Sequence, residues 1–233
     1  GGEFGQMAGL VYDCFIEDQI VIDPIRLPEG TKYFGGIDWG YTDPFVISVR
    51  ALTPNGHQFK VSEFYKTGLT PNEMILAAKQ KMQIFNIEKF YADPSRPEYI
   101  EAFNRERIPT VKADNDIRIG IDTHYELIQS GRYKIFKGTS PYAIDEYSSY
   151  HYPEEKDLKP DEDSKEILPV DAGNHAMDCE RYLTMALKSR SVERHAPIIP
   201  NSEMSEKIRQ DHNLRIKFLK RSKKNFPGSE NFS

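Results

Sequence analysis

The sequence has few cysteines and no long hydrophobic run. Only Cys14 and Cys179 occur among 233 residues, and neither stands in a CxxC or CxxH spacing. This excludes a disulfide scaffold and a cysteine-based structural zinc site, and it fits a reducing compartment. No apolar stretch is long enough to cross a bilayer, and no secretory signal pattern opens the chain. We therefore expect no membrane partner.

The composition allows one good-sized domain with extensions. Hydrophobic residues make up 38% and aromatic residues 12% of the chain, which is enough for a packed core. The net charge of −5 does not by itself indicate a nucleic-acid-binding protein. From the patterns below we expect a lead-in segment at 1–30 that packs on the domain, the domain itself at 31–189, and a basic, flexible tail at 190–233.

Hydrophobic periodicity predicts three strands followed by alternating helices and strands. The strands are expected at 32–39, 45–52 and 58–65, the third half-exposed because polar and apolar residues alternate in it. A capping box of Thr70 and Glu73 predicts a helix that ends near Phe85. The later patterns predict strands at 10–16, 89–93, 110–112 and 133–136 (the last at a sheet edge), and helices at 97–105, 117–129, 141–149 and 171–187.

This order, βββ-α-β-α-β-α-α apart from the lead-in and the extra edge strand, predicts an α/β fold. Three antiparallel strands followed by alternating helices and strands form a mixed sheet with helices on both faces.

Acidic residues stand where strands of this sheet end. Asp38 closes the first strand and Asp93 closes the fourth, and ligands of α/β sheets collect at such ends. In the last helix, His175 and Asp178 share a face because they are three residues apart. Carboxylates that come together repel one another unless a cation neutralises them. Such a cluster suits Mg²⁺ or Mn²⁺, and two ions about 4 Å apart can promote phosphodiester hydrolysis.

Each of these residues also has a structural interpretation. Asp38 and Asp93 could be turn formers, although the repeated strand-then-Asp pattern favours a functional role. His175 could be a hydrogen-bonded bystander, and Asp171 is at least as well explained as a helix cap. We expect packing roles for Trp39 and Tyr182 and surface positions for His57, His124, His151, His195 and His212.

Three short segments resemble a known family. They are Gly35-Gly-Ile-Asp-Trp-Gly40, Tyr91-Ala-Asp-Pro-Ser95 and Asn174-His-Ala-Met-Asp-Cys-Glu-Arg-Tyr182. In this order the sequence resembles the ribonuclease H-like fold and, more narrowly, the C-terminal nuclease domain of the large terminase subunit of tailed bacteriophages. The resemblance covers about Gly2 to Leu187, and the segment Gly9–Phe15 resembles the connection from that nuclease to its ATPase.

The resemblance implies a metal-dependent endonuclease that cuts concatemeric phage DNA during packaging in the host bacterial cytoplasm. It makes Asp38, Asp93 and Asp178 the metal ligands and His175 a neighbouring ligand or base. It also implies double-stranded DNA, the terminase ATPase domain, the small terminase subunit and the portal as partners. The chain has no GxxxxGK[ST] phosphate loop, so it would be the nuclease half without the packaging motor.

Other interpretations of the same residues stay open. The turn Asp38-Trp-Gly40 would suit the actin and sugar-kinase superfamily, but that architecture needs a second such domain and a second phosphate loop. A junction resolvase or a ribonuclease H is possible among nucleases, and a non-catalytic docking module is the alternative outside enzymes. The charged segment 153–169 is a candidate gate over the acidic cluster, and the basic tail is the expected contact with DNA or another partner.

Overall fold

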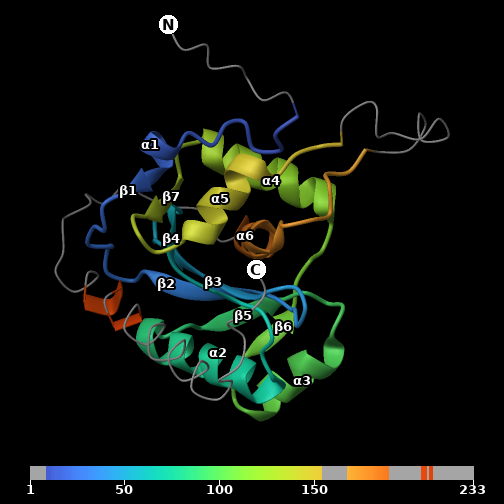
Figure 1. Cartoon of the computed structure of the whole chain (residues 1–233). Coiled ribbons are helices and arrows are strands. Elements are labelled where there is room, and N and C mark those ends of the chain that lie inside the picture. Colours follow the sequence, from blue (N-terminus) through green and yellow to red (C-terminus); the bar gives the residue numbers. More distant parts are fainter. Residues whose placement is uncertain (1–8, 154–166, 189–205, 209, 212–233) are drawn as a thin grey trace, which may run out of the picture.

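A computed structural model describes residues 9–153, 167–188, 206–208, 210 and 211 of the chain (Figure 1). Its centre is a seven-stranded sheet with the order β1-β7-β4-β3-β2-β5-β6. The strands are β1 (Val21–Ile22), β2 (Lys32–Asp38), β3 (Phe45–Leu52), β4 (Gln58–Lys66), β5 (Lys89–Ala92), β6 (Thr110–Lys112) and β7 (Tyr133–Phe136). The helices are α1 (Glu17–Ile20), α2 (Pro71–Phe85), α3 (Pro97–Arg105), α4 (Ile117–Gln129), α5 (Pro141–Ser149) and α6 (His175–Leu187).

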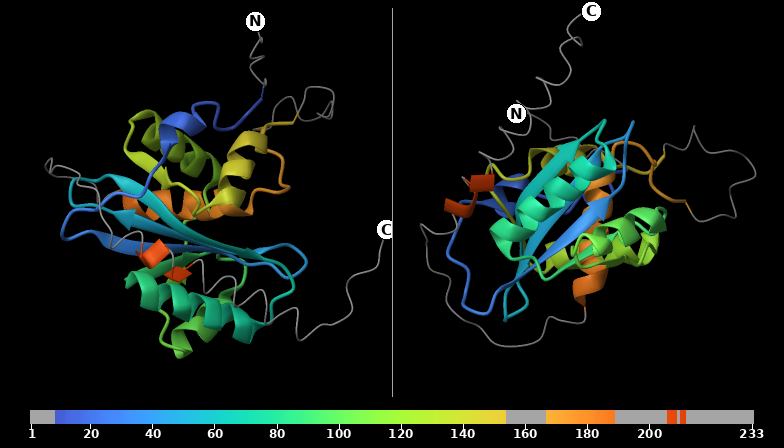
Figure 2. Two further views of the ribbon diagram at one scale, coloured as in Figure 1. Left: turned by 60° about the vertical axis from the view of Figure 1, so that its left-hand side comes forward. Right: turned by 90° about the horizontal axis from the view of Figure 1, so that it is seen from below.

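The sheet is mixed and is covered by helices on both faces. Strands β2, β3 and β4 are antiparallel, and the remaining pairings are parallel. Helices α2 and α3 lie on one face, and α4, α5 and α6 lie on the other (Figures 1 and 2). The predicted α/β fold with helices on both faces is therefore confirmed.

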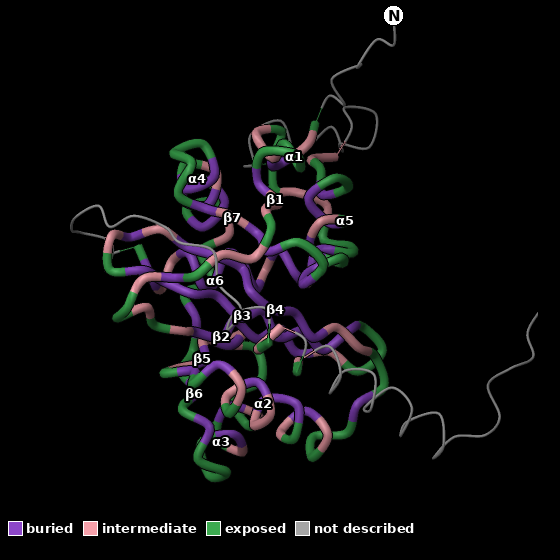
Figure 3. The backbone as a smooth tube through the Cα atoms, turned by 90° about the vertical axis from the view of Figure 1, so that its left-hand side faces the viewer, coloured by how far each residue is buried: buried purple, intermediate pink, exposed green. Residues whose placement is uncertain are grey.

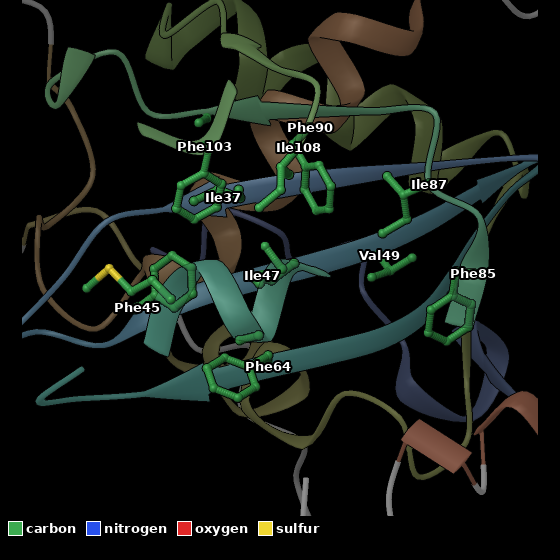
Figure 4. Packing of buried hydrophobic residues seen from close by; sticks show 14 of the residues in the cluster. Ile37, Phe45, Ile47, Val49, Phe64, Phe85, Ile87, Phe90, Phe103 and Ile108 are labelled. Atoms are coloured by element: carbon green, nitrogen blue, oxygen red, sulfur yellow. The ribbon is translucent and has the colours of Figure 1, made fainter. Parts of the chain in front are cut away.

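The α2 face of the sheet carries the larger apolar core. Phe45, Ile47 and Phe64 of the sheet belong to one buried cluster with Phe85 of α2 and Phe103 of α3 (Figure 4). Helix α2 spans the predicted residues because its capping box forms. The side chain of Thr70 accepts a hydrogen bond from the backbone N–H of Glu73, and the Glu73 carboxylate accepts one from the N–H of Thr70.

The prediction that β4 is half-exposed is wrong, because helices cover both of its faces (Figure 3). A register shift opposite Val49 and Arg50 disturbs the alternation along β4. Lys60 lies under α6 together with Arg50, and both are fully buried. The polar residues that alternate along β4 are therefore buried among other polar side chains and do not face solvent.

The lead-in differs from the predicted strand at 10–16. Leu10 makes only an isolated bridge to His151, and Val11 and Tyr12 enter the core. The chain then forms α1 and the two-residue strand β1, which pairs in parallel with β7. The prediction that β7 is an edge strand is therefore wrong, because β1 lies outside it.

Part of the C-terminal segment lies against the domain. Ile208 packs on the core of the α2 face, and the Asp211 carboxylate accepts hydrogen bonds from the buried Lys81 and, at 2.6 Å, from Ser62. Residues 154–166 and most of the basic tail lie outside the described residues, and with them the candidate gate and most of the expected DNA contacts. In the part of the chain that is described, no helix has the length and apolarity needed to span a bilayer.

Candidate active site

Asp38 and Asp93 lie at the same edge of the sheet. Strands β2 and β5 are parallel neighbours, with Ile37 opposite Ala92, so the residues that follow emerge side by side. The N–H of Asp93 donates to the carbonyl of Ile37 over 2.9 Å. The first and fourth strands of the predicted order are therefore adjacent, as an acidic cluster at this edge requires.

Helix α6 crosses this part of the sheet at very close range. A Cβ atom added to Gly36 would stand 2.7 Å from the carbonyl oxygen of Cys179 in α6. Glycine is thus required in β2 for the helix backbone to lie directly on the strand. This approach brings Nδ1 of His175 to 2.9 Å from Oδ2 of Asp38.

The carboxylates of Asp38, Asp93 and Asp178 line one cavity of about 380 Å³. Asp171 lines it as well. His175 does not line the cavity but forms a hydrogen bond with Asp38, which does. The remaining lining residues are Asn115, Ile117, Tyr150, Leu168, Pro169, Asn174, Arg181 and Tyr182. Acidic residues from a strand end, a second strand end and a helix thus meet in one depression.

This cavity is unfavourable for negative charge. Asp38 is 7% exposed, and burial raises its pKa to about 6 even though the hydrogen bond with His175 lowers it. The charges of Asp178 and Asp93 raise the Asp38 pKa further. Burial also raises the pKa of Asp178, against the effect of its ion pair with Arg181. A bound cation would relieve both the desolvation and the mutual repulsion.

The protonated form of His175 is stabilised beside Asp38. The hydrogen bond with the Asp38 carboxylate raises the pKa of His175, and burial opposes this effect less strongly. The imidazole ring also meets the ring of Tyr65 edge-on, at 6.5 Å between centroids. Packing and hydrogen bonding together fix the orientation of His175.

The acidic side chains have protein partners in the structure. Asp178 accepts a hydrogen bond from Arg181 at 2.7 Å, and Asp93 accepts hydrogen bonds from the hydroxyl and, at 3.0 Å, the N–H of Ser95. Within the described residues, no three Asp, Glu, His or Cys side chains stand together as a ready group of metal ligands. The hard carboxylate oxygens around the cavity nevertheless match the donor chemistry of a divalent ion such as Mg²⁺.

Arg181, which was not among the residues predicted from the sequence, pairs with Asp178 and is only 3% exposed. Its aliphatic stem lies across α4 where Gly120 leaves room, since a Cβ there would come within 2.2 Å of the Arg181 Cγ. The spacing of three residues between Asp178 and Arg181 on a helix is a signal that could have predicted the pair.

A buried charged cluster beneath α6 was also missed. The Glu180 carboxylate is fully buried and pairs with Arg50 and, at 2.8 Å, with Lys60. Burial alone would raise the pKa of Glu180, but the charges of Arg50 and Lys60 hold it well below its usual value. Nothing in the local sequence distinguishes Glu180 from a surface glutamate.

The prediction that His124 lies at the surface is wrong. Its side chain is fully buried between α4 and α6, with Nδ1 2.8 Å from the Thr184 hydroxyl and Nε2 2.6 Å from the Tyr147 hydroxyl. Burial lowers the pKa of His124 to about 3. Trp39 packs as predicted, with Phe45 and Phe103 around its ring.

Glu146 of α5 is a further buried carboxylate next to the site. Its Oε2 accepts hydrogen bonds from the backbone N–H groups of Ala176 and Met177, at 2.7 and 3.0 Å. Its Oε1 accepts a hydrogen bond from the Tyr65 hydroxyl at 2.9 Å. Burial raises the pKa of Glu146 to about 7, although these three hydrogen bonds lower it.

Neither the protein-family models nor the curated proteins contain a match to this sequence. Solved structures do share the fold. The large terminase of a thermophilic bacteriophage matches with a TM-score of 0.69 and 23% identity over 77% of this chain and 45% of that one. This chain thus spans less than half the length of that large terminase.

Two isolated nuclease domains match over nearly their whole length. The nuclease domain of the P22 large terminase has a TM-score of 0.64 and 16% identity, over 78% of this chain and 93% of that one. The nuclease domain of the large terminase from bacteriophage SPP1, whose structure contains bound Mn, has a TM-score of 0.51 and 17% identity over 72% and 94%. The chain therefore has the fold of terminase nuclease domains, and at the level of the fold the resemblance seen in the sequence is confirmed.

Proposed function

We propose that this chain is the nuclease part of a large terminase and that it cleaves DNA with the help of divalent metal ions. The observation that carries the proposal is the meeting of Asp38, Asp93 and Asp178 in one cavity. These residues are far apart in the sequence, and all three are the positions that the resemblance marks as metal ligands. The shared fold and the manganese in the SPP1 domain support the same conclusion.

Asp38, Asp93 and Asp178 would hold two ions, Mg²⁺ or Mn²⁺. When bound, such ions supply an activated water and stabilise the charge that develops on phosphate oxygens. Asp38 stands between Asp93, which follows the neighbouring strand, and α6, so it would hold the ions together with Asp93 and Asp178. His175 orients the Asp38 carboxylate through its Nδ1 contact, and its imidazole would orient or deprotonate water.

The biological setting follows from the resemblance. The substrate would be concatemeric double-stranded phage DNA in the host bacterial cytoplasm, cut during packaging. The ATPase domain of the same subunit, the small terminase subunit and the portal would be its partners. Because the chain spans 45% of the large terminase from the thermophilic phage, DNA translocation would depend on residues outside the present sequence.

A plasmid-nicking assay tests the proposal. We expect the chain to nick supercoiled plasmid when Mn²⁺ or Mg²⁺ is added and to stop when EDTA removes the ion. Asp38→Asn should lower the rate by more than about 100-fold, beyond the 10–100-fold that loss of a residue supporting a metal site costs. Asp145→Asn is the matched control, because Asp145 is exposed on α5 away from the cavity lining, and it should leave the rate unchanged.

Two results would overturn the proposal. One is cleavage by Asp38→Asn at the wild-type rate. The other is wild-type protein that is folded but cuts no DNA at any Mn²⁺ concentration, as expected of a non-catalytic docking module. A preference for four-way junctions over linear duplex would point instead to a junction resolvase.

A further inference from the structure

We propose that Glu146 is a positioning residue that holds the first turn of α6 and, with it, His175 and Asp178. This inference rests on the proposed nuclease function, since it assigns a task to a residue that does not line the cavity. The first N–H groups of any helix have no partner within that helix and need an acceptor from elsewhere.

Helix α6 obtains this acceptor from another helix. Its N-cap residue, Asn174, makes no side-chain capping hydrogen bond within the described part of the chain. Oε2 of Glu146 takes that place, because it accepts from the N–H groups of Ala176 and Met177. A carboxylate at this end of a helix also interacts favourably with the helix dipole, and hydrogen bonds to a charged acceptor are stronger than neutral ones.

Glu146 is itself firmly held. It is 5% exposed, and its second oxygen accepts the hydrogen bond of the Tyr65 hydroxyl. The ring of Tyr65 stacks on that of Tyr142, with 4.2 Å between centroids. The carboxylate therefore has little freedom to leave α6.

The start of α5, the helix that carries Glu146, is held in the same way. Ser140, the N-cap residue of α5, makes no side-chain capping bond with described residues. Glu63 of β4 accepts instead from the N–H groups of Tyr142 and Ala143, at 3.1 and 3.0 Å. The central sheet thus fixes the start of α5 through Glu63, and α5 fixes the start of α6 through Glu146.

The consequence for the site follows from the positions of its residues. His175 and Asp178 are the first and fourth residues of α6, so both lie in the turn that Glu146 holds. Without this acceptor the turn would open more often, as helix ends do when their capping is lost. An error of about 1 Å in the position of a reacting group can cost about 100-fold in rate.

The test compares Glu146→Ala with Glu146→Gln and Thr70→Ala. Thr70→Ala is the matched control because it removes the cap of α2, on the opposite face of the sheet. Amide hydrogen exchange of residues 175–178 reports on the turn without any metal or DNA. In Glu146→Ala we expect this exchange to be roughly tenfold faster, with wild-type exchange in Thr70→Ala.

Plasmid nicking links the turn to the reaction. Glu146→Ala should lower kcat by about tenfold or more while KM for DNA stays near the wild-type value, because positioning and not DNA binding is impaired. Both measurements are made at pH 8.5, where Glu146, with its pKa of about 7, is ionised. Glu146→Gln keeps an acceptor oxygen but loses the charge, so it should fall between wild type and Glu146→Ala in both measurements. If Glu146→Ala does not fold, the proposal is decided by whether Glu146→Gln shows faster amide exchange and a lower kcat than the wild type.

The outcomes separate the two proposals. Wild-type exchange and kcat in a folded Glu146→Ala, or in Glu146→Gln if that is the folded variant, would refute the positioning role and leave the nuclease proposal standing. Equal losses of kcat in Glu146→Ala and Thr70→Ala would refute it too, since general destabilisation would then explain both. A wild-type protein without nuclease activity would overturn the proposed function, and the exchange comparison would still decide whether Glu146 holds the turn.

Discussion

Replacing Glu180 by alanine should destabilise the protein more than any exposed ion pair can. The Glu180 side chain is fully buried, and it pairs with two cations, Arg50 and Lys60, that are fully buried as well. It also accepts hydrogen bonds from the hydroxyls of Ser48 and Tyr133. Alanine would leave two positive charges in the core without this carboxylate.

The size of the effect follows from the cost of a buried charge. Removing one partner of a buried ion pair costs about 3–5 kcal/mol, because the remaining charge stays desolvated. A domain is stable by only about 5–15 kcal/mol, so this is a large share of the total. For a chain of this size the corresponding drop in Tm is roughly 6–20 °C.

Urea unfolding monitored by circular dichroism measures the change. Glu88→Ala is the matched control, because it removes one partner of the Lys32–Glu88 pair, whose side chains are 57% and 40% exposed. Such a surface pair contributes about 0–1 kcal/mol. A loss below about 1 kcal/mol for Glu180→Ala would refute the reasoning, since it would mean that water or a rearranged partner compensates the two cations.

Two further predictions follow from the same region. Gly36→Ala should lower the free energy of unfolding in urea by about 1–3 kcal/mol and should also lower the nicking rate, because the alanine Cβ would push α6 away from β2. Unchanged stability would contradict the close approach of α6 to β2. Because burial keeps the pKa of His124 near 3, the unfolded state binds more protons than the folded state between about pH 3 and 6.5. From pH 8 to pH 5 the wild type should therefore lose roughly 2 kcal/mol more unfolding free energy than His124→Gln, and equal slopes for the two proteins would show that His124 titrates normally.

The sheet could largely be predicted because its signals are local. The capping box at Thr70, the apolar runs before Asp38 and Asp93, and the spacing of His175 and Asp178 each depend on neighbouring residues. The local signals did not show that the first and fourth predicted strands are neighbours, because consecutive strands pair most often and two other strands lie between these in the sequence. The grouping of Asp38, Asp93 and Asp178 was therefore implied by the family resemblance and not by these local signals.

The support of the site could not be predicted, because it depends on contacts between distant elements. Lys60 and Glu180 are separated by 120 positions, and neither has a sequence context unlike that of a solvated residue. His124 and Glu146 are similar cases, since their burial arises only when α4, α5 and α6 pack together. Local periodicity also misassigned β4 as half-exposed, because the helices that bury both of its faces are distant from it in the sequence.

The contact of Asp211 with Lys81 and Ser62 bears on how the basic C-terminal region should be shortened in the laboratory. Deleting everything after residue 188 would remove positive charges and would also take away the carboxylate over a lysine that is 3% exposed. Weaker DNA cleavage by such a protein would then mix an electrostatic effect with damage to the α2 face. A stop codon placed after Asp211 separates the electrostatic effect from the structural damage. It deletes most of the lysines and arginines of this region and keeps the Asp211 carboxylate that pairs with Lys81.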